Sequence, residues 1–190
     1  MRKSLAAVAV FATLANVSLA GAAGIHQRAP YQAFGNLSGV GDCGYESDAN
    51  LVLHRWPRAR ITTDEVESAY DNLGNLFAGT DVTTDGGEIW TAQGLWTAQN
   101  YLLSKGFGGH RATSIVQVTT RATEIASAND GGLEVVNEGP VRMHVFDIIA
   151  ANRTHVVIVD DGYVYHYSWA WLDWAYTQNS ETLSYYAVTW

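Results

Sequence analysis

Residues 155–167 read His-Val-Val-Ile-Val-Asp-Asp-Gly-Tyr-Val-Tyr-His-Tyr, two β-rich runs separated by an Asp-Asp-Gly turn. Branched and aromatic side chains favour strands, and Asp-Gly between such runs is typical of a β-hairpin. The stretch therefore predicts two adjacent antiparallel strands.

The rest of the chain divides into a helical half and a β-rich half. Apolar spacing predicts helices at 46–56, 63–73 and 88–105. Outside the hairpin, the β-rich runs are 114–119, 141–146 and 185–188, with a short helix at 120–129. Helices first and strands later predict an α+β fold in which a helical half packs on an antiparallel sheet half.

The composition bounds the class of protein. The 190 residues are 47% hydrophobic and 12% aromatic, which is enough for the core of one domain and too aromatic for a disordered chain. Asp and Glu number 19 against 11 Lys and Arg. Phosphate binding needs clustered basic side chains, so no nucleic acid partner is expected. A single cysteine excludes an internal disulfide framework and a Cys-rich zinc site, and no metal or organic cofactor is expected.

The N-terminus has the pattern of a secretory signal peptide over residues 1–22. A short basic head precedes an apolar run that begins at Leu5, and small residues follow, so that cleavage is expected after Ala20 or Ala22. The run is short for a membrane span and lacks a basic stop on its far side. We therefore expect a secreted, extracellular domain over 23–190, with no membrane association after cleavage.

Cys43 lies in Gly41-Asp42-Cys43-Gly44, immediately before the first expected helix. The unpaired N–H groups and the dipole of a helix N-terminus stabilise a thiolate there. The flanking glycines leave room for a substrate. Many free cysteines are instead small buried hydrophobes, and position alone leaves both interpretations open.

A thiolate nucleophile needs an imidazole to hold it ionised and to protonate the leaving group. Among six histidines, His155 is the expected partner because it opens an apolar strand in the other half of the fold. His144 and His166 lie inside strand patterns with no loop to expose them. Two halves that meet in a cleft, each giving one member of the pair, would form the site. A half-exposed histidine at a strand end is the alternative.

The motifs occur in the order found in papain-superfamily cysteine peptidases. Gly41-Asp42-Cys43-Gly44 and the helix after it resemble the nucleophile helix, closest to the bacteriocin-processing and streptopain-like branches. Asp85-Gly86-Gly87 is similar to the Gly-Gly segment of the substrate cleft, and 137–141 to the turn before the strand of the catalytic histidine. His155 and the later Ser168-Trp169 pair resemble the histidine strand and its Trp-rich neighbour.

The resemblance implies a papain-like fold and a thiol hydrolase that cleaves peptide or amide bonds. Cys43 would attack the carbonyl carbon and His155 would move the proton, through an acyl-enzyme intermediate. Trp169 would shield the histidine from solvent, and Gly86 and Gly87 would line the cleft. The partner would be a protein or peptide substrate, and a monomer is expected.

Two positions depart from the family pattern around the nucleophile and the histidine. Leu37 stands where the family usually has the oxyanion-hole Gln, so that Asn36 and Ser38 are the expected substitutes. The Asn that orients the histidine falls on Ser168, or on Tyr167 in the papain register. The other candidate orienters are Asp161 and Asp173.

A third departure leaves the activity open. In another register, Cys43 aligns with the structural cysteine of papain-type enzymes and Glu46 with the nucleophile, which predicts an inactive relative. The bacteriocin-processing register keeps Cys43 as nucleophile and matches the following helix better. The alternatives are therefore a non-catalytic binding or effector domain, and a cell-wall amidase or endopeptidase of the same superfamily.

Overall fold

The computed structural model describes residues 43–74, 92–106, 110–138, 143–160, 162–177 and 181–190. The expected signal peptide and four of the expected site residues lie outside these ranges: Asn36, Ser38, Gly86 and Gly87. Within the described part, no helix is long and apolar enough to cross a membrane.

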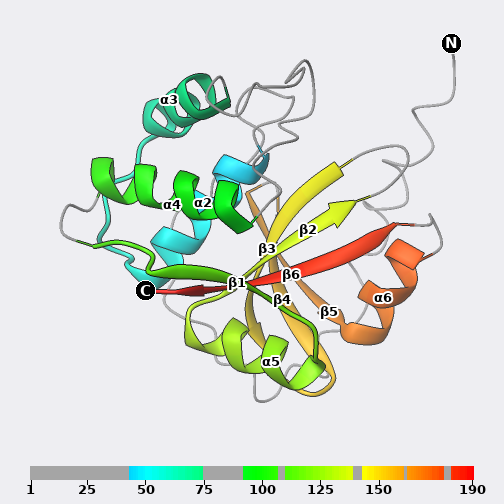
Figure 1. Ribbon diagram of the computed structural model, residues 1–190. Helices are drawn as coiled ribbons and strands as arrows, with labels where there is room; N and C mark the ends of the chain where they lie inside the picture. Colours follow the sequence, from blue (N-terminus) through cyan, green and yellow to red (C-terminus); the bar gives the residue numbers. More distant parts are fainter. Residues whose placement is uncertain (1–42, 75–91, 107–109, 139–142, 161, 178–180) are drawn as a thin grey trace, which may run out of the picture.

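A six-stranded antiparallel sheet forms the centre of the molecule, with the strand order β1-β6-β2-β3-β4-β5 (Figure 1). Its strands are β1 (Ser114–Val118), β2 (Leu133–Glu138), β3 (Met143–Ala151), β4 (His155–Asp160), β5 (Tyr163–Ser168) and β6 (Thr182–Thr189). The expected 155–167 hairpin is present as β4 and β5, which pair from His155 opposite Ser168 to Asp160 opposite Tyr163.

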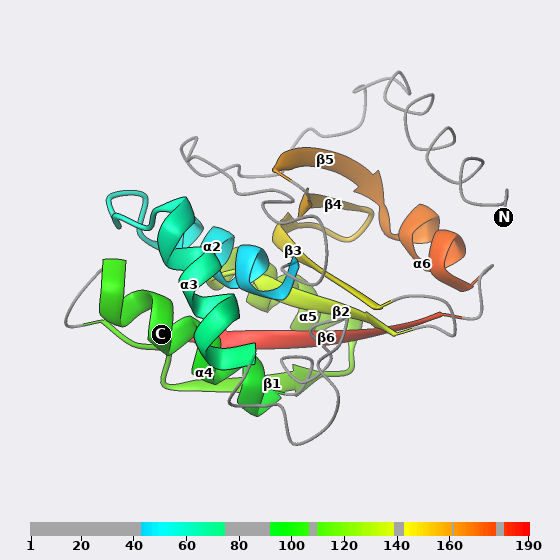
Figure 2. The same cartoon turned by 90° about the horizontal axis from the view of Figure 1, so that it is seen from above.

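Five helices cover the sheet in the described part of the chain. They are α2 (Cys43–Arg55), α3 (Thr63–Gly74), α4 (Ala92–Gly106), α5 (Arg121–Asp130) and α6 (Trp169–Thr177). The first three gather on one side of the molecule, and α6 lies at the opposite end (Figure 2). The mixed α+β class expected from the sequence is thus confirmed.

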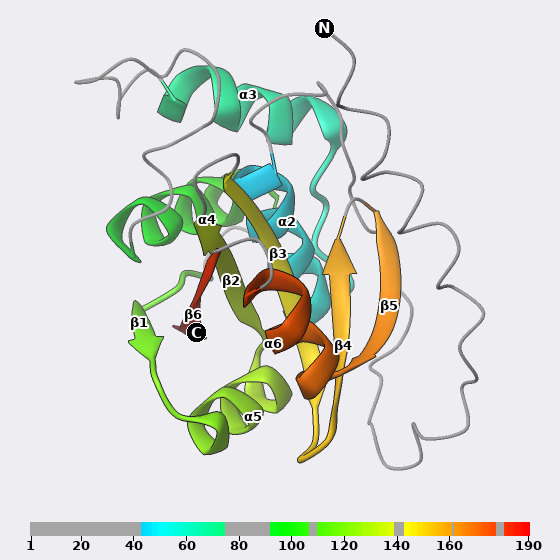
Figure 3. The same cartoon turned by 90° about the vertical axis from the view of Figure 1, so that its right-hand side faces the viewer.

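The two faces of the sheet have separate cores. On one face, α2 contributes Leu51 to a cluster with Ile149 of β3 and Val157 of β4. On the other face, α5 and α6 pack on the alternate residues of the same strands, which include Phe146 and Ile158. Side chains alternate between faces along a strand, so neighbouring residues of β3 belong to different cores. Figure 3 views the sheet from the side of α6.

Helix α2 is buried along nearly its whole length. Every residue from Gly44 to His54 is buried, because the helix lies between the sheet and the layer of α3 and α4. It begins at Cys43 and ends at Arg55, two residues before Pro57, which cannot continue a helix. Cys43 is thereby fixed at the N-terminus of the most enclosed helix described.

Two elements were not expected from the sequence. The first is β2, which includes Asn137, a residue expected in a turn. The polar side chains of Glu134 and Asn137 are buried there and interrupt the apolar pattern that would indicate a strand. Helix α6 is rich in Trp and Tyr, which favour strands. Its first turn is capped by the Ser168 Oγ, which accepts the N–H of Trp171 at 3.1 Å and favours the helix at this point.

Candidate active site

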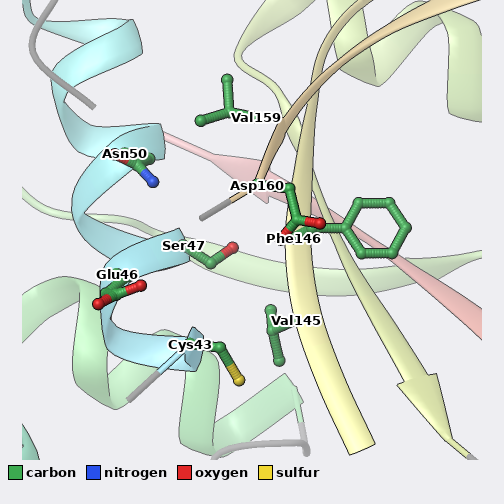
Figure 4. Close-up of a pocket in the computed structure, with 8 residues that line it drawn as sticks. All are labelled: Cys43, Glu46, Ser47, Asn50, Val145, Phe146, Val159 and Asp160. Carbon is green, nitrogen blue, oxygen red and sulfur yellow. The ribbon is translucent and has the colours of Figure 1, made fainter. Parts of the chain in front are cut away.

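Cys43 occupies the first position of α2 and remains partly exposed. Its side chain packs against a small buried cluster formed by Leu95, Val136, Val145 and Tyr186. Figure 4 shows its sulfur beside Val145, which is the chain neighbour of His144 on β3. The thiol therefore lies at the point where the helix N-terminus meets the beginning of β3.

His144 lies between Cys43 and Asp160. Its Nε2 is 2.6 Å from Oδ1 of Asp160, the last residue of β4. Because Nε2 is bound to the carboxylate, Nδ1 is the nitrogen left for the Cys43 side chain, with which His144 forms a hydrogen bond. The three side chains form a Cys-His-Asp series of the type that activates a nucleophile.

The β3–β4 pairing places the histidine and the aspartate together. Asp147 is opposite Val159 in the register, so Asp160 lies beside Phe146 and diagonally from His144. Diagonal side chains on one face of a sheet are within reach of each other. The side chains of His144 and Asp160 keep 17% and 27% of their surface exposed, so the pair is shielded but accessible.

The pKa of His144 reflects opposing effects. Burial alone lowers it, but the hydrogen bonds to Asp160 and Cys43 and the electrostatic effect of these two neighbours raise it, to about 10 in all. The imidazole therefore carries a proton at neutral pH. A protonated imidazole next to a sulfur is the form that can hold a thiolate and then give its proton to a leaving amine.

A small pocket opens beside Cys43, between α2 and the β3–β4 pair (Figure 4). Its residues are Cys43, Glu46, Ser47 and Asn50 from α2, and Val145, Phe146, Val159 and Asp160 from the sheet. Ser47 and Asn50 point from the helix toward the strands. The pocket therefore has polar side chains on its α2 side, and on its sheet side three apolar residues together with the Asp160 carboxylate.

The structure does not pair Cys43 with His155, the histidine expected from the sequence. His155 begins β4, five residues before Asp160, and a rise of roughly 3.3 Å per residue puts it about 16 Å from that end of the strand. Its ring Nδ1 lies 2.9 Å from the Thr154 Oγ1. Its backbone N–H donates to the Asn152 Oδ1 at 2.9 Å. The residue belongs to the β3–β4 turn.

The residues expected to assist His155 lie at that same turn or beyond it. Ser168, the expected orienter, is the register partner of His155, but its hydroxyl caps α6. Trp169 donates its indole N–H to the Asn152 carbonyl at 2.8 Å and stacks under Arg121 at 3.6 Å, so it covers the turn and not His144. Asp173 accepts two hydrogen bonds from Arg121 at 3.0 Å and orients no histidine. Asp161 is outside the described residues.

Sequence reasoning missed His144 and Asp160 because it judged each from its own segment. The β-rich pattern around His144 indicates a strand interior, yet β3 begins at Met143, so His144 is the second residue of its strand. Asp160 was assigned to a turn, yet it ends β4. The usable signal was the antiparallel pairing itself, because two strands joined by a short turn place the end of the second beside the start of the first.

Within the described ranges, no group of three or more His, Cys, Asp or Glu side chains is arranged to hold a metal ion. No protein-family model, curated protein or solved structure matches this chain.

Proposed function

We propose that this protein is an exported thiol hydrolase with a papain-like fold, which cleaves peptide or amide bonds with Cys43, His144 and Asp160. One observation carries the proposal: the same His144 imidazole has two hydrogen-bond partners. Its Nε2 lies 2.6 Å from the Asp160 Oδ1, and the Cys43 side chain is the second partner. Support for the fold comes from a cysteine-bearing helix that packs on an antiparallel sheet. Support for export comes from the signal-peptide pattern of residues 1–22.

Each side chain has a defined step in the proposed reaction. The Cys43 thiolate attacks the carbonyl carbon, and the negative charge moves to the carbonyl oxygen, near the N-terminal N–H groups of α2. The His144 imidazolium then donates its proton to the leaving amine, the C–N bond breaks, and a thioester remains. Water attacks the thioester while His144 accepts a proton, and the acid product leaves as the thiolate is restored.

Asp160 supports this cycle without reacting. Its carboxylate fixes the ring so that Nδ1 faces the sulfur, and its charge stabilises the imidazolium. With His144 in the role expected of His155, the class of reaction expected from the sequence is unchanged. The proton-transfer group is then at the same end of the sheet as the Cys43 thiol.

The test is hydrolysis of a fluorogenic peptide library and of peptidoglycan fragments by wild type and Cys43→Ala. We expect turnover by the wild type alone, with an acyl adduct on Cys43 seen by mass spectrometry after rapid acid quench. Cleavage of peptidoglycan but not of the peptide library would place the enzyme with the cell-wall amidases. Turnover retained by folded Cys43→Ala, or no turnover on either substrate class together with an unreactive thiol, would refute the proposal.

A further inference from the structure

Three carboxyl groups lie buried between α2 and the sheet, behind the pocket wall. Asp48 comes from α2, Glu134 from β2 and Asp147 from β3, and each is 0% exposed. Glu134 and Asp147 are direct register partners in the β2–β3 pair. Two acids directly opposite each other on one sheet face repel when both are ionised. We call these three residues the carboxyl cluster.

Hydrogen-bond donors satisfy only a small part of the carboxyl cluster. The Ser47 Oγ donates to Oδ1 of Asp147 at 2.5 Å. Among the described residues, both oxygens of Asp48, both of Glu134 and Oδ2 of Asp147 receive no well-aligned hydrogen bond. The Gln99 amide of α4 lies against Asp48 and Glu134, and those two carboxyls also lie against each other. Two carboxyl groups can hydrogen-bond only when one of them holds a proton.

The groups that face the carboxyl cluster from the surrounding elements supply no positive charge in the described structure. The charges that act on Asp48 are Glu134 and Asp147, and those that act on Asp147 are Glu134 and Asp160 of β4. From α2 and α4 the nearest polar neighbours are Ser47 and Gln99.

The remaining titratable neighbours are an acid on α2 and a phenol on β6. Glu46 lies on α2 two positions before Asp48, and Tyr186 of β6 is the register partner of Glu134. His144 stands on β3 three positions before Asp147, so it points to the opposite sheet face. The cluster therefore has acids and neutral groups around it, and a proton is the simplest source of balance.

Burial first, and then the mutual repulsion of the carboxylates, raises the pKa of Asp48 and of Asp147 well above the ordinary value. Burial also raises the pKa of Glu134, although its contacts with Asp48 and Gln99 act in the opposite direction. All three directions favour the protonated, uncharged form. The arrangement does not suit a metal ion, since these residues are not among any metal-binding group in the described ranges.

We propose that Asp48, Glu134 and Asp147 retain shared protons in the folded protein at neutral pH, and that the packing of α2 on the sheet depends on those protons. The inference concerns the fold and not hydrolysis, so it does not rest on the proposed function. It makes the domain most stable in acid and less stable as the pH rises.

The direction follows from linkage. In the unfolded chain these carboxyls ionise near pH 4, whereas in the folded protein they keep their protons to higher pH. The part of the folding stability that these protons contribute is therefore fully present below about pH 4. It is lost as the pH rises through the folded-state pKa values. Each retained proton lowers the folding equilibrium constant about tenfold per pH unit between the two values. The raised pKa of His144 adds a fall of the same sign, which is common to the wild type and the variants below.

The experiment is urea unfolding of the full chain from pH 4 to pH 9, for wild type, Asp48→Asn and Glu134→Gln. An amide supplies the N–H that the carboxyl cluster otherwise needs as a proton. We expect the wild type to lose stability steeply as the pH rises, and both variants to lose less and to exceed the wild type at pH 8. The exposed Asp64→Asn at the start of α3 is the matched control and should keep the wild-type slope.

Equal pH slopes in wild type and both variants would overturn the proposal. If the variants do not fold, the wild type alone decides: the infrared C=O band of a protonated carboxyl should persist at pH 7 in the folded protein and vanish on unfolding. Absence of that band at pH 7 would also overturn it. Neither readout involves the Cys43 thiol, so a failed hydrolase proposal leaves the result intact.

Discussion

A histidine lies at each end of strand β4, His155 within the strand and His144 of β3 beside Asp160, and the two have different surroundings. At the Asp160 end, a carboxylate binds His144 at 2.6 Å beside the N-terminus of α2. At the His155 end, the imidazole contacts Thr154, and Asn152 holds the turn. Both ends place a histidine at a strand terminus, but only one lies next to the thiol. In the proposed reaction, proximity to the N-terminus of α2, and not position at a strand start, selects the histidine.

The two ends of β4 differ in the kind of contact that they make. The His155 end is a network of short backbone contacts: Asn152 accepts from the N–H groups of Thr154 and His155, and Trp169 donates to its carbonyl. These bonds hold the β3–β4 turn in shape. At the Asp160 end, by contrast, the described contacts act on one imidazole, that of His144.

The largest expected effect is that of removing each histidine in turn. His144→Ala should lower kcat/KM on the best peptide substrate by about 10³-fold or more, because the proton donor and the partner of the thiolate are lost together. His155→Ala, the matched control, should change kcat/KM by less than about twofold. Steady-state kinetics on folded variants decides between the two ends, and a larger loss for His155→Ala would reverse the assignment.

A smaller loss is expected from Asp160→Asn. The amide keeps the shape of the side chain but loses its charge, so the pKa of His144 should fall and kcat/KM should drop by roughly 10²-fold. Asp173→Asn is the control, since Asp173 forms a partly exposed ion pair with Arg121 on α5. NMR titration of the His144 ring, with kinetics on both variants, checks this. An unchanged titration in Asp160→Asn would contradict the role given to that carboxylate.

The smallest effect on activity, with a clear effect on stability, is expected from Asn152→Ala. This change removes the acceptor for two N–H groups of the β3–β4 turn and should lower the free energy of unfolding by about 1–2 kcal/mol. Activity should stay within about twofold, because the turn lies at the far end of the strand. Chemical unfolding and kinetics measure both. A strong loss of activity without loss of stability would bring the His155 end back into the reaction.

The sequence predicted most of the fold because its signals were local. Pro57 after the first helix and Asp-Asp-Gly between β4 and β5 mark boundaries that depend only on neighbours in the chain. Cys43 was found for the same reason, since a helix start is a local feature. Helix α6 was not expected because four of its nine residues are Trp or Tyr, which favour strands, and the Ser168 hydroxyl that caps it is a single-residue signal.

The partner of Cys43 could not be found this way because it depends on pairing between strands. His144 and Asp160 are 16 residues apart and meet only through the β3–β4 register. The register shifts between Ile148 and Ala150, and no local sequence pattern predicts that shift. The buried positions of Glu134 and Asp147 were hidden for the same reason, since each appears in the sequence as an ordinary polar residue.

The most direct test is the rate of Cys43 alkylation by iodoacetamide from pH 4 to pH 10, in wild type, His144→Ala and His155→Ala. The account predicts fast alkylation below pH 7 in wild type and His155→Ala, because the imidazolium of His144 holds the thiolate. In His144→Ala the fast reaction in acid should be lost, because no imidazolium remains beside the sulfur. Loss in His155→Ala with retention in His144→Ala would contradict the Cys43–His144–Asp160 site.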